Sequence, residues 1–227
     1  MENRKRYTAI VLAAGSGRRM QSDTPKQFME LCGHPLVYYS LYAFEKSPVD
    51  DIILVTGKDD VSYCRKEIVE ACDFRKVRAV IPGGKERYHS TLAALNVYKD
   101  EPCHLIIHDA VRLLVTSRII DHVIEALESH AACTAAIPST DTILQSDTSR
   151  QFVDNIPDRS TLFQVQTPQG FHSDILTEAY NKALSDPEFF SPDDCGVVKR
   201  YLPETPIKIT QGLPFNIKLT YKEDLSI

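Results

Sequence analysis

The sequence predicts an α/β fold built on a doubly wound, mostly parallel, Rossmann-like sheet. Three observations lead to this expectation. Short apolar runs alternate along the chain with longer segments of helical periodicity. The runs lack a polar face, as strands do when helices cover both sides of a sheet. Parallel strands are joined by right-handed crossovers, which makes such a sheet doubly wound.

Each expected element follows from its local pattern. The apolar runs expected to form strands are Tyr7–Ala13, Asp51–Thr56, Val77–Ile81, Leu105–His108 and Cys133–Ile137. The helical patterns between them are Leu36–Phe44, Val61–Ala71, Thr91–Tyr98 and Ser117–His130. The last helix is the clearest, because Ile120, Val123 and Leu127 share one face and Thr116 stands at the expected N-cap.

The alternation stops after Pro138. Residues 139–160 are polar, with two short apolar stretches on either side of a turn, which predicts a β-arm within a single domain of residues 1–227. An isolated hairpin is only marginally stable, so a homodimer that covers its apolar face is expected. Beyond the arm we expect helices at Ser173–Leu184 and Asp194–Arg200 and strands at Ile207–Thr210 and Phe215–Leu219.

Composition excludes several classes of protein. The 227 residues include 26 Lys and Arg against 31 Asp and Glu, and this net charge of −5 disfavours a nucleic-acid binder. The six cysteines have no framework spacing, and no apolar run is long enough to span a membrane. We therefore expect reduced thiols in a cytoplasmic protein without a membrane partner. Basic residues outnumber acidic ones in the first 26 residues, which indicates one compact anionic ligand.

The first expected strand runs into a turn that contains Gly15 and Gly17, followed by Arg19 and Lys26. Glycines at this place let backbone N–H groups approach an anion, and the two cations could hold further phosphate oxygens. The spacing is not that of a Walker P-loop. Met20 stands at the third glycine position of the dinucleotide fingerprint, so a dehydrogenase is disfavoured. The alternative is a tight turn with solvated arginines and no ligand.

Two further turns lie at strand ends. Gly84 and Ser90 belong to a glycine turn that enters a helix and could read the edge of a base, although an ordinary strand-to-helix connection has the same pattern. Asp109 ends another strand, where it could hold Mg²⁺, and Arg112 could neutralise a phosphate. A surface Asp–Arg pair is the alternative, and His108 is expected to be a structural histidine.

Positive charge is expected to converge from distant parts of the chain. The residues that supply it are Arg19, Lys26, Arg112, Arg159 and Lys218. Lys218 lies within an apolar pattern, where a lysine is costly to bury unless it meets an anion. No histidine base and no serine or cysteine nucleophile constellation accompanies these cations. This combination favours phosphoryl or nucleotidyl transfer, in which catalysis is mostly positioning and charge stabilisation.

The ordered motifs of the chain resemble those of the 2-C-methyl-D-erythritol 4-phosphate cytidylyltransferases. They are A-A-G-S-G-R-R-M, T-P-K-Q-F, G-G-K-E-R-x-x-S, H-D-A-V-R, D-T-I, P-D-R, Q-T-P-Q-G-F and N-I-K-L-T, from about Ala9 to Leu225. The resemblance implies the nucleotide-diphospho-sugar transferase type of α/β fold. It also implies Mg²⁺-dependent transfer of CMP from CTP to a polyol phosphate, with release of pyrophosphate, in non-mevalonate isoprenoid precursor biosynthesis.

The resemblance further implies roles by position. Residues that would act on the phosphates of CTP are Arg19, Lys26 and Lys218. Residues that would bind the nucleotide are Ala14, Gly15, Gly17, Gly84 and Ser90. Residues that would bind the acceptor are Asp109, Arg112, Thr142, Arg159 and Thr167. Asp109 would also serve the metal, and the arm residues Thr142 and Arg159 would reach the neighbouring subunit of a homodimer.

Two alternatives stay open. The near relatives of this family are ribitol-5-phosphate cytidylyltransferases, which make CDP-ribitol, although A-A-G, H-D-A and D-R in this chain favour the methylerythritol family. The other alternative is an inactive nucleotide-binding paralogue. Pro192 and Gly196 replace a family threonine and serine, unless Ser191 supplies the missing hydroxyl, and Leu113 replaces a proline.

Overall fold

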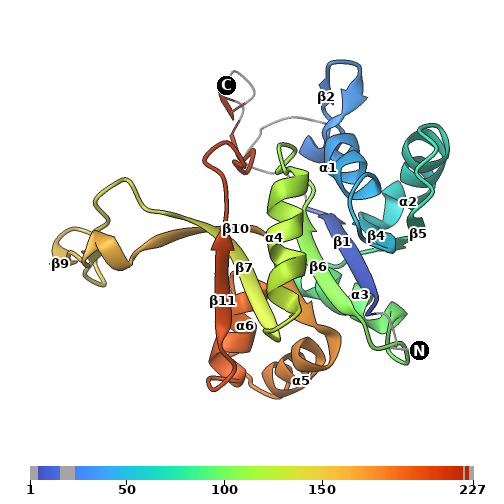
Figure 1. The fold of residues 1–227 in the computed structure, drawn as a ribbon. Helices are drawn as coiled ribbons and strands as arrows, with labels where there is room; N and C mark the ends of the chain where they lie inside the picture. Colours follow the sequence, from blue (N-terminus) through green and yellow to red (C-terminus); the bar gives the residue numbers. More distant parts are fainter. Residues whose placement is uncertain (1–4, 16–23, 222, 225–227) are drawn as a thin grey trace.

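The computed structural model describes residues 5–15, 24–221 and 223–224. Its centre is a seven-stranded sheet in the order β11-β7-β10-β6-β1-β4-β5 (Figure 1). The strands are β1 (Tyr7–Ala13), β4 (Asp51–Thr56), β5 (Val77–Pro82), β6 (His104–Asp109), β7 (Ala132–Pro138), β10 (Phe163–His172) and β11 (Ile207–Gln211). β10 runs antiparallel to β6 and β7, and the other neighbours in the sheet are parallel. The predicted mostly parallel sheet is confirmed.

The strand order reverses next to β1. The chain moves outward from β1 through β4 to β5 and then returns to place β6 on the other side of β1. Such a reversal leaves a crevice at the carboxyl ends of the strands, where open α/β sheets bind their ligands. The topology therefore points to the ends of β1 and β6 as the place for a site.

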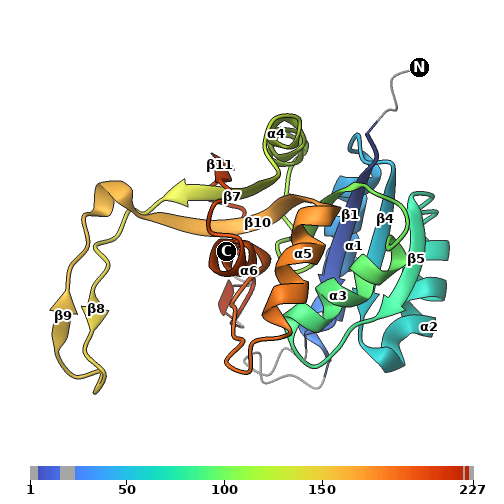
Figure 2. The same ribbon diagram turned by 90° about the horizontal axis from the view of Figure 1, so that it is seen from below.

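Helices cover both faces of the sheet (Figure 2). They are α1 (Leu36–Glu45), α2 (Val61–Tyr63), α3 (Arg87–Val97), α4 (Ser117–Leu127), α5 (Ser173–Ala183) and α6 (Asp194–Tyr201). α1 and α4 pack on one face, and α3, α5 and α6 pack on the other. Shorter elements are η2 (Lys26–Phe28), η3 (Lys58–Asp60), η4 (Cys64–Glu70), η5 (Arg159–Thr161) and the ribbon of β2 (Glu30–Leu31) and β3 (His34–Pro35). The doubly wound arrangement is confirmed.

The sheet separates two hydrophobic cores. Ala9 and Val11 of β1 enter the core under α1 and α4, whereas Ile10 between them enters the core under α3 and α5. Successive side chains of a strand point to opposite faces, so a strand covered on both sides must be apolar at every position. This explains why β4 is buried along its whole length.

A two-stranded arm leaves the sheet between β7 and β10 (Figures 1 and 2). It consists of β8 (Gln145–Ser146) and β9 (Val153–Asn155), which pair antiparallel. The predicted hairpin within 139–160 is confirmed. Its apolar side chains are open to solvent, with Phe152 70% exposed and Ile156 59% exposed. Nothing in the described part of this domain covers them.

The strand predicted at Phe215–Leu219 is wrong. It makes no strand ladder: a turn lies at Pro214 and Phe215, where the Asn216 N–H donates to the carbonyl oxygen of Leu213 at 3.0 Å, and side chains hold the rest in place. Asn216 is buried and donates to the carbonyl oxygen of Thr167 at 2.9 Å, and Gln166 Nε2 donates to the carbonyl oxygen of Leu213 at 2.9 Å. Apolar alternation alone does not distinguish a strand from an irregular segment that packs on a core.

One long strand, β10, the two-residue strands β2 and β3, and part of one helix were not predicted. β10 was not predicted because its sequence contains Pro168 and Gly170, which are unusual in a central strand. The register shift between Val165 and Gln169 places Pro168 where the ladder with β7 is interrupted. α3 begins at Arg87 rather than Thr91, since Glu86 and His89 form a reciprocal capping box.

Other boundaries and expectations compare as follows. Thr116 stands at the N-cap of α4 as predicted, but its hydroxyl makes no capping hydrogen bond. The segment Val61–Ala71 is helical as predicted, although η4 within it is a π-helix.

All six cysteines are free thiols. Among the described residues, no helix is both long and apolar enough to cross a bilayer.

Candidate active site

The carboxyl ends of β1, β5 and β6 surround a cleft of about 320 Å³. This volume lies in the range of pockets that hold small ligands. The cleft is lined by Leu12, Ala13, Ala14, Gly15, Lys26, Gln27, Gly84, Lys85, Glu86, Arg87, Ser90, Asp109, Val111, Lys218 and Thr220. The structure thus brings together Ala14, Gly15, Lys26, Gly84, Ser90, Asp109 and Lys218, which are all predicted site residues.

One wall of the cleft is made by the turn after β1 and the start of α3. Gly83 allows the two to approach, because a Cβ atom there would lie 2.7 Å from the Cβ of Ala14 and closer still to Ser90 Oγ. A methyl group at this position would push the turn and the helix apart. Ala14, Gly84 and Ser90 therefore present backbone groups and one hydroxyl on a narrow wall, which suits recognition of a flat base edge.

The opposite side carries Lys26, at the start of η2. Its side chain is buried, and Nζ donates to the carbonyl oxygen of Leu219 at 2.8 Å. This bond ties Lys26 to the segment that holds Lys218, so two ammonium groups from distant parts of the chain border one cleft. Such a pair is suited to the phosphates of a nucleotide.

Asp109 lies at the end of β6 between two cations. Its Oδ2 accepts a hydrogen bond from Lys218 Nζ at 2.6 Å, and its Oδ1 accepts one from Arg87 Nε at 3.3 Å. Burial would raise the pKa of Asp109, but Arg87 and then Lys218 outweigh it and hold the pKa well below its usual range. Asp109 is a carboxylate throughout the physiological range, as a ligand for a metal or for hydroxyl groups must be. The alternative of a surface Asp–Arg pair with Arg112 is wrong, because Asp109 is buried and its partners are Arg87 and Lys218.

Behind Asp109, a chain of hydrogen bonds fixes the backbone. Thr167 Oγ1 accepts from the Asp109 N–H at 3.1 Å and lies 3.0 Å from His108 Nδ1, while His108 Nε2 lies 3.2 Å from the carbonyl oxygen of Arg112. Burial lowers the pKa of His108 to about 4, so the ring is neutral and structural, as predicted. The predicted acceptor residue Thr167 is buried and does not line the cleft.

Arg112 also hydrogen-bonds to backbone groups around the site. Its Nη1 donates to the carbonyl oxygen of Asn216 at 2.7 Å, and its Nη2 donates to that of Val165 at 3.3 Å. These bonds join β10 to the segment that carries Lys218. Arg112 therefore holds two backbone carbonyl groups of the site.

The remaining predicted residues lie elsewhere. Thr142, which precedes β8, and Arg159, the first residue of η5, are exposed, and neither lines the cleft of its own chain. Arg159 Nη1 donates to the carbonyl oxygen of Thr140 at 3.1 Å. The predicted roles of Gly17 and Arg19 fall on residues 16–23, outside the described residues.

Comparison with known proteins decides the family. The 2-C-methyl-D-erythritol 4-phosphate cytidylyltransferase family matches residues 7–227. The chain belongs to this family. The family's enzyme from Lachnoclostridium phytofermentans is 44% identical over 221 residues, which are 97% of this chain and 94% of that protein. The one from Lachnospira eligens is 44% identical over 222 residues, 97% of this chain and 96% of that protein.

Solved structures agree with the family assignment. The crystal structure of 4-diphosphocytidyl-2C-methyl-D-erythritol synthase from Anaerococcus prevotii has a TM-score of 0.86 to this chain at 30% identity. The match covers 98% of this chain and 93% of that one. The shared fold is the predicted α/β architecture of a cytidylyltransferase.

Two departures from the cytidylyltransferase pattern are coupled in space. Ser191 Oγ donates to the carbonyl oxygen of Asp193 at 2.7 Å, and a Cβ atom at Gly196 would lie 2.6 Å from that hydroxyl. Gly196 therefore leaves the space that the Ser191 side chain occupies. Ser191 does not line the described cleft. Leu113 packs against the small core of Leu36, Val111 and Leu219.

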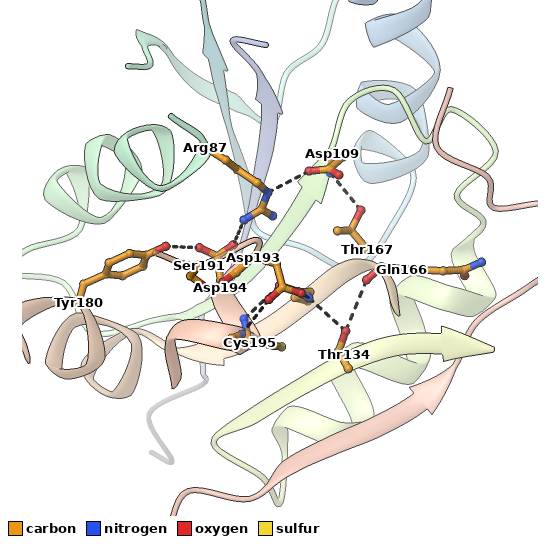
Figure 3. Close-up of polar contacts among 12 residues, drawn as sticks. Arg87, Asp109, Thr134, Gln166, Thr167, Tyr180, Ser191, Asp193, Asp194 and Cys195 are labelled. Carbon is orange, nitrogen blue, oxygen red and sulfur yellow. Dashed lines mark hydrogen bonds and ion pairs between the residues drawn. The ribbon is translucent and has the colours of Figure 1, made fainter. Parts of the chain in front are cut away.

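Sequence reasoning missed two charged residues of this cytidylyltransferase, Arg87 and Asp194 (Figure 3). Arg87 belongs to the G-G-K-E-R motif but had no assigned role, and Asp194 follows Asp193 at the start of α6. The available signals were an arginine directly after a glycine turn and a pair of acids before a helix. Both are common on surfaces, and only the fold shows that the two residues meet.

Proposed function

We propose that this protein transfers CMP from CTP to 2-C-methyl-D-erythritol 4-phosphate and releases pyrophosphate, in non-mevalonate isoprenoid precursor biosynthesis. The family match over residues 7–227 supports this proposal. The single observation that carries it is the cleft, in which Lys26, Asp109 and Lys218 meet beside a glycine-lined wall at the strand-order reversal. This is the arrangement that transfer between two phosphorylated molecules requires.

The reaction needs charge stabilisation rather than a base. An oxygen of the acceptor phosphate attacks the α-phosphorus of CTP, a new P–O bond forms, and the bond to the bridging oxygen of the β-phosphate breaks. Pyrophosphate leaves with the electron pair. The attacking oxygen is already an anion, so no proton has to be removed first. Lys26 and Lys218 would stabilise the negative charge that develops around the α-phosphorus.

The nucleotide would lie with its base on the wall of Ala14, Gly84 and Ser90. The triphosphate would then extend past Gly15 toward Lys26, with Gly17 and Arg19 expected to add contacts from the turn after β1. Specificity for cytosine would come from backbone groups of this wall and from the Ser90 hydroxyl.

The predicted cofactor is Mg²⁺, and the donors present fit it. Mg²⁺ in nucleotide enzymes is usually held by one or two carboxylates together with phosphate oxygens and water. Asp109 is a carboxylate beside the two phosphate-binding lysines, so it would hold Mg²⁺ with oxygens of CTP. When bound, Mg²⁺ would neutralise charge on the pyrophosphate. Among the described residues no group of three potential metal ligands occurs.

The acceptor site would be completed by a second copy of the chain. The exposed apolar residues of the arm, such as Phe152 and Ile156, need a cover that its own domain does not supply. In a homodimer the arm would carry Thr142 and Arg159 to the partner's acceptor phosphate. Free thiols at all six cysteines support a reducing, cytoplasmic location.

The test is a panel of polyol phosphates with CTP and Mg²⁺, read by release of pyrophosphate. Turnover of methylerythritol phosphate, with little turnover of ribitol 5-phosphate, is expected. Turnover of ribitol 5-phosphate alone would support CDP-ribitol synthesis instead. No turnover of any polyol phosphate, with CTP still bound, would support the inactive paralogue.

A further inference from the structure

A cluster of four charged groups connects the cleft to the interior of the protein. Its members are Lys218, Asp109, Arg87 and Asp194, called here the Arg87 cluster. Figure 3 shows the last three. Lys218, Asp109 and Arg87 line the cleft, and the first two of these have predicted roles. Asp194 is fully buried at the start of α6 and has no part in the chemistry proposed above.

Arg87 is the link between the two carboxylates. Its Nε donates to Asp109 Oδ1 at 3.3 Å, and its Nη1 donates to Asp194 Oδ2. Only a planar guanidinium can offer separate N–H groups to two acids at fixed angles, because a lysine has a single ammonium at the end of a flexible chain. Arg87 is the first residue of α3, so it also joins the glycine-lined wall of the cleft to the end of β6.

The charges in the cluster balance as two cations and two anions. A buried carboxylate such as Asp194 is tolerated because Arg87 neutralises it and Tyr180 Oη donates to its Oδ1 at 2.6 Å. Asp194 in turn accepts a hydrogen bond from Arg87 Nη1 and so restrains the orientation of the guanidinium. Without it, Arg87 would be free to turn both of its N–H edges toward Asp109 and to cover the second oxygen of that carboxylate.

We propose that Arg87 and Asp194 are positioning residues that divide the two oxygens of Asp109 between the protein and the acceptor. Arg87 holds Oδ1, and Asp194 restrains Arg87, so that Oδ2 stays directed at the cleft. There it pairs with Lys218 in the free protein and accepts from a hydroxyl of the polyol phosphate when Lys218 moves to the α-phosphate. This inference rests on the proposed function, since it assigns the acceptor to Asp109.

The decisive variants are Arg87→Gln, Asp194→Asn and the double variant. Arg87→Gln leaves Asp194 as an unpaired buried charge, so its melting temperature should fall by about 10 °C. The double variant removes both charges, and its melting temperature should return most of the way to the wild-type value. Its kcat/KM for the acceptor should nevertheless remain about 10- to 100-fold below the wild-type value, because no guanidinium then fixes the position of the Asp109 carboxylate. The Kd for CTP, measured without Mg²⁺ so that Asp109 holds no metal, should change less than kcat/KM for the acceptor does.

A merely structural role predicts a different result. If Arg87 and Asp194 only hold the fold together, acceptor kcat/KM of the double variant would recover along with its melting temperature, and the proposal would be overturned. Tyr180→Phe is the matched control, since it removes a hydrogen bond from the same carboxylate and leaves its charge. It should keep kcat/KM within about threefold of wild type. A loss equal to that of Asp194→Asn would overturn the assignment to the Asp194 charge.

A crystal structure of the double variant tests the geometry without any substrate. The Asp109 carboxylate should rotate away from the position that it has in the wild-type protein, while the backbone of β6 and α6 stays in place. An unchanged Asp109 would overturn the proposal. The crystal structure and the turnover assay therefore test two different claims. A wild-type protein without turnover would reject the proposed function. The position of Asp109 in the double variant would still test the positioning role of Arg87 and Asp194.

Discussion

Replacing Lys218 by glutamine should separate the chemistry of this site from its stability. The Lys218 Nζ lies 2.6 Å from Asp109 Oδ2, and its side chain is 38% exposed. A partly exposed pair of this kind contributes no more than about 1 kcal/mol to the free energy of unfolding. For a chain of this length, such a loss lowers the melting temperature by about 2–4 °C. Asp109 also keeps Arg87 as a partner, so the variant should fold.

The expected effect on turnover is far larger. A charged donor aimed at the developing negative charge of the α-phosphate contributes about 3–4 kcal/mol to the transition state, or about 10²- to 10³-fold in kcat. The assay is pyrophosphate release with saturating CTP, acceptor and Mg²⁺, together with a thermal melt. Lys208→Gln, at an exposed lysine of β11, is the matched control and should leave both measurements near wild type. A kcat of Lys218→Gln within threefold of wild type would refute the role given to Lys218.

Three further predictions test other parts of the molecule. Gly83→Ala should raise the Kd for CTP, measured by calorimetry, by about tenfold or more, because its methyl group would separate Ala14 from Ser90. An unchanged Kd would show that the base does not bind against this wall. Phe152→Asp should convert a dimer to monomers in light scattering at micromolar concentration, whereas a dimer that survives would place the interface elsewhere. Burial, and then His172, lower the pKa of His104 from 6.5 to about 4. The stability that depends on neutral His104 is therefore present above pH 6.5 and should be lost as the pH falls toward 4. In urea titrations at pH 7 and 5, His104→Phe should show less of this loss, and an equal loss would contradict the assignment.

Local patterns were sufficient for most of the fold. β4 and β7 were predicted to within one residue at each end because a strand covered on both faces must be a continuous apolar run. The arm was predicted from the loss of that pattern. By contrast, β10 combines polar residues with Pro168 and Gly170, and its place in the centre of the sheet depends on its neighbours rather than on its own sequence.

The site divides in the same way. Asp109 was found at the end of an expected strand, Lys26 after the glycine turn that follows the first strand, and Lys218 as a lysine within an apolar pattern. The cleft contains all three. The supporting residues Arg87 and Asp194 were not found from the sequence. Arg112 and Thr167 stay predicted acceptor residues, and the structure adds that both hydrogen-bond to backbone groups of the site.

The sequence by itself determined the fold class, the projecting arm, the family and several of the residues that line the cleft. Each of these follows from a short stretch of the chain, such as a periodic pattern of apolar residues, a turn or a motif. The tertiary structure alone decided that Arg87 bridges Asp109 and Asp194, which lie far apart along the chain. A buried charge is stable only beside its counter-charge, and which residues become neighbours in the interior depends on how the whole sheet is assembled.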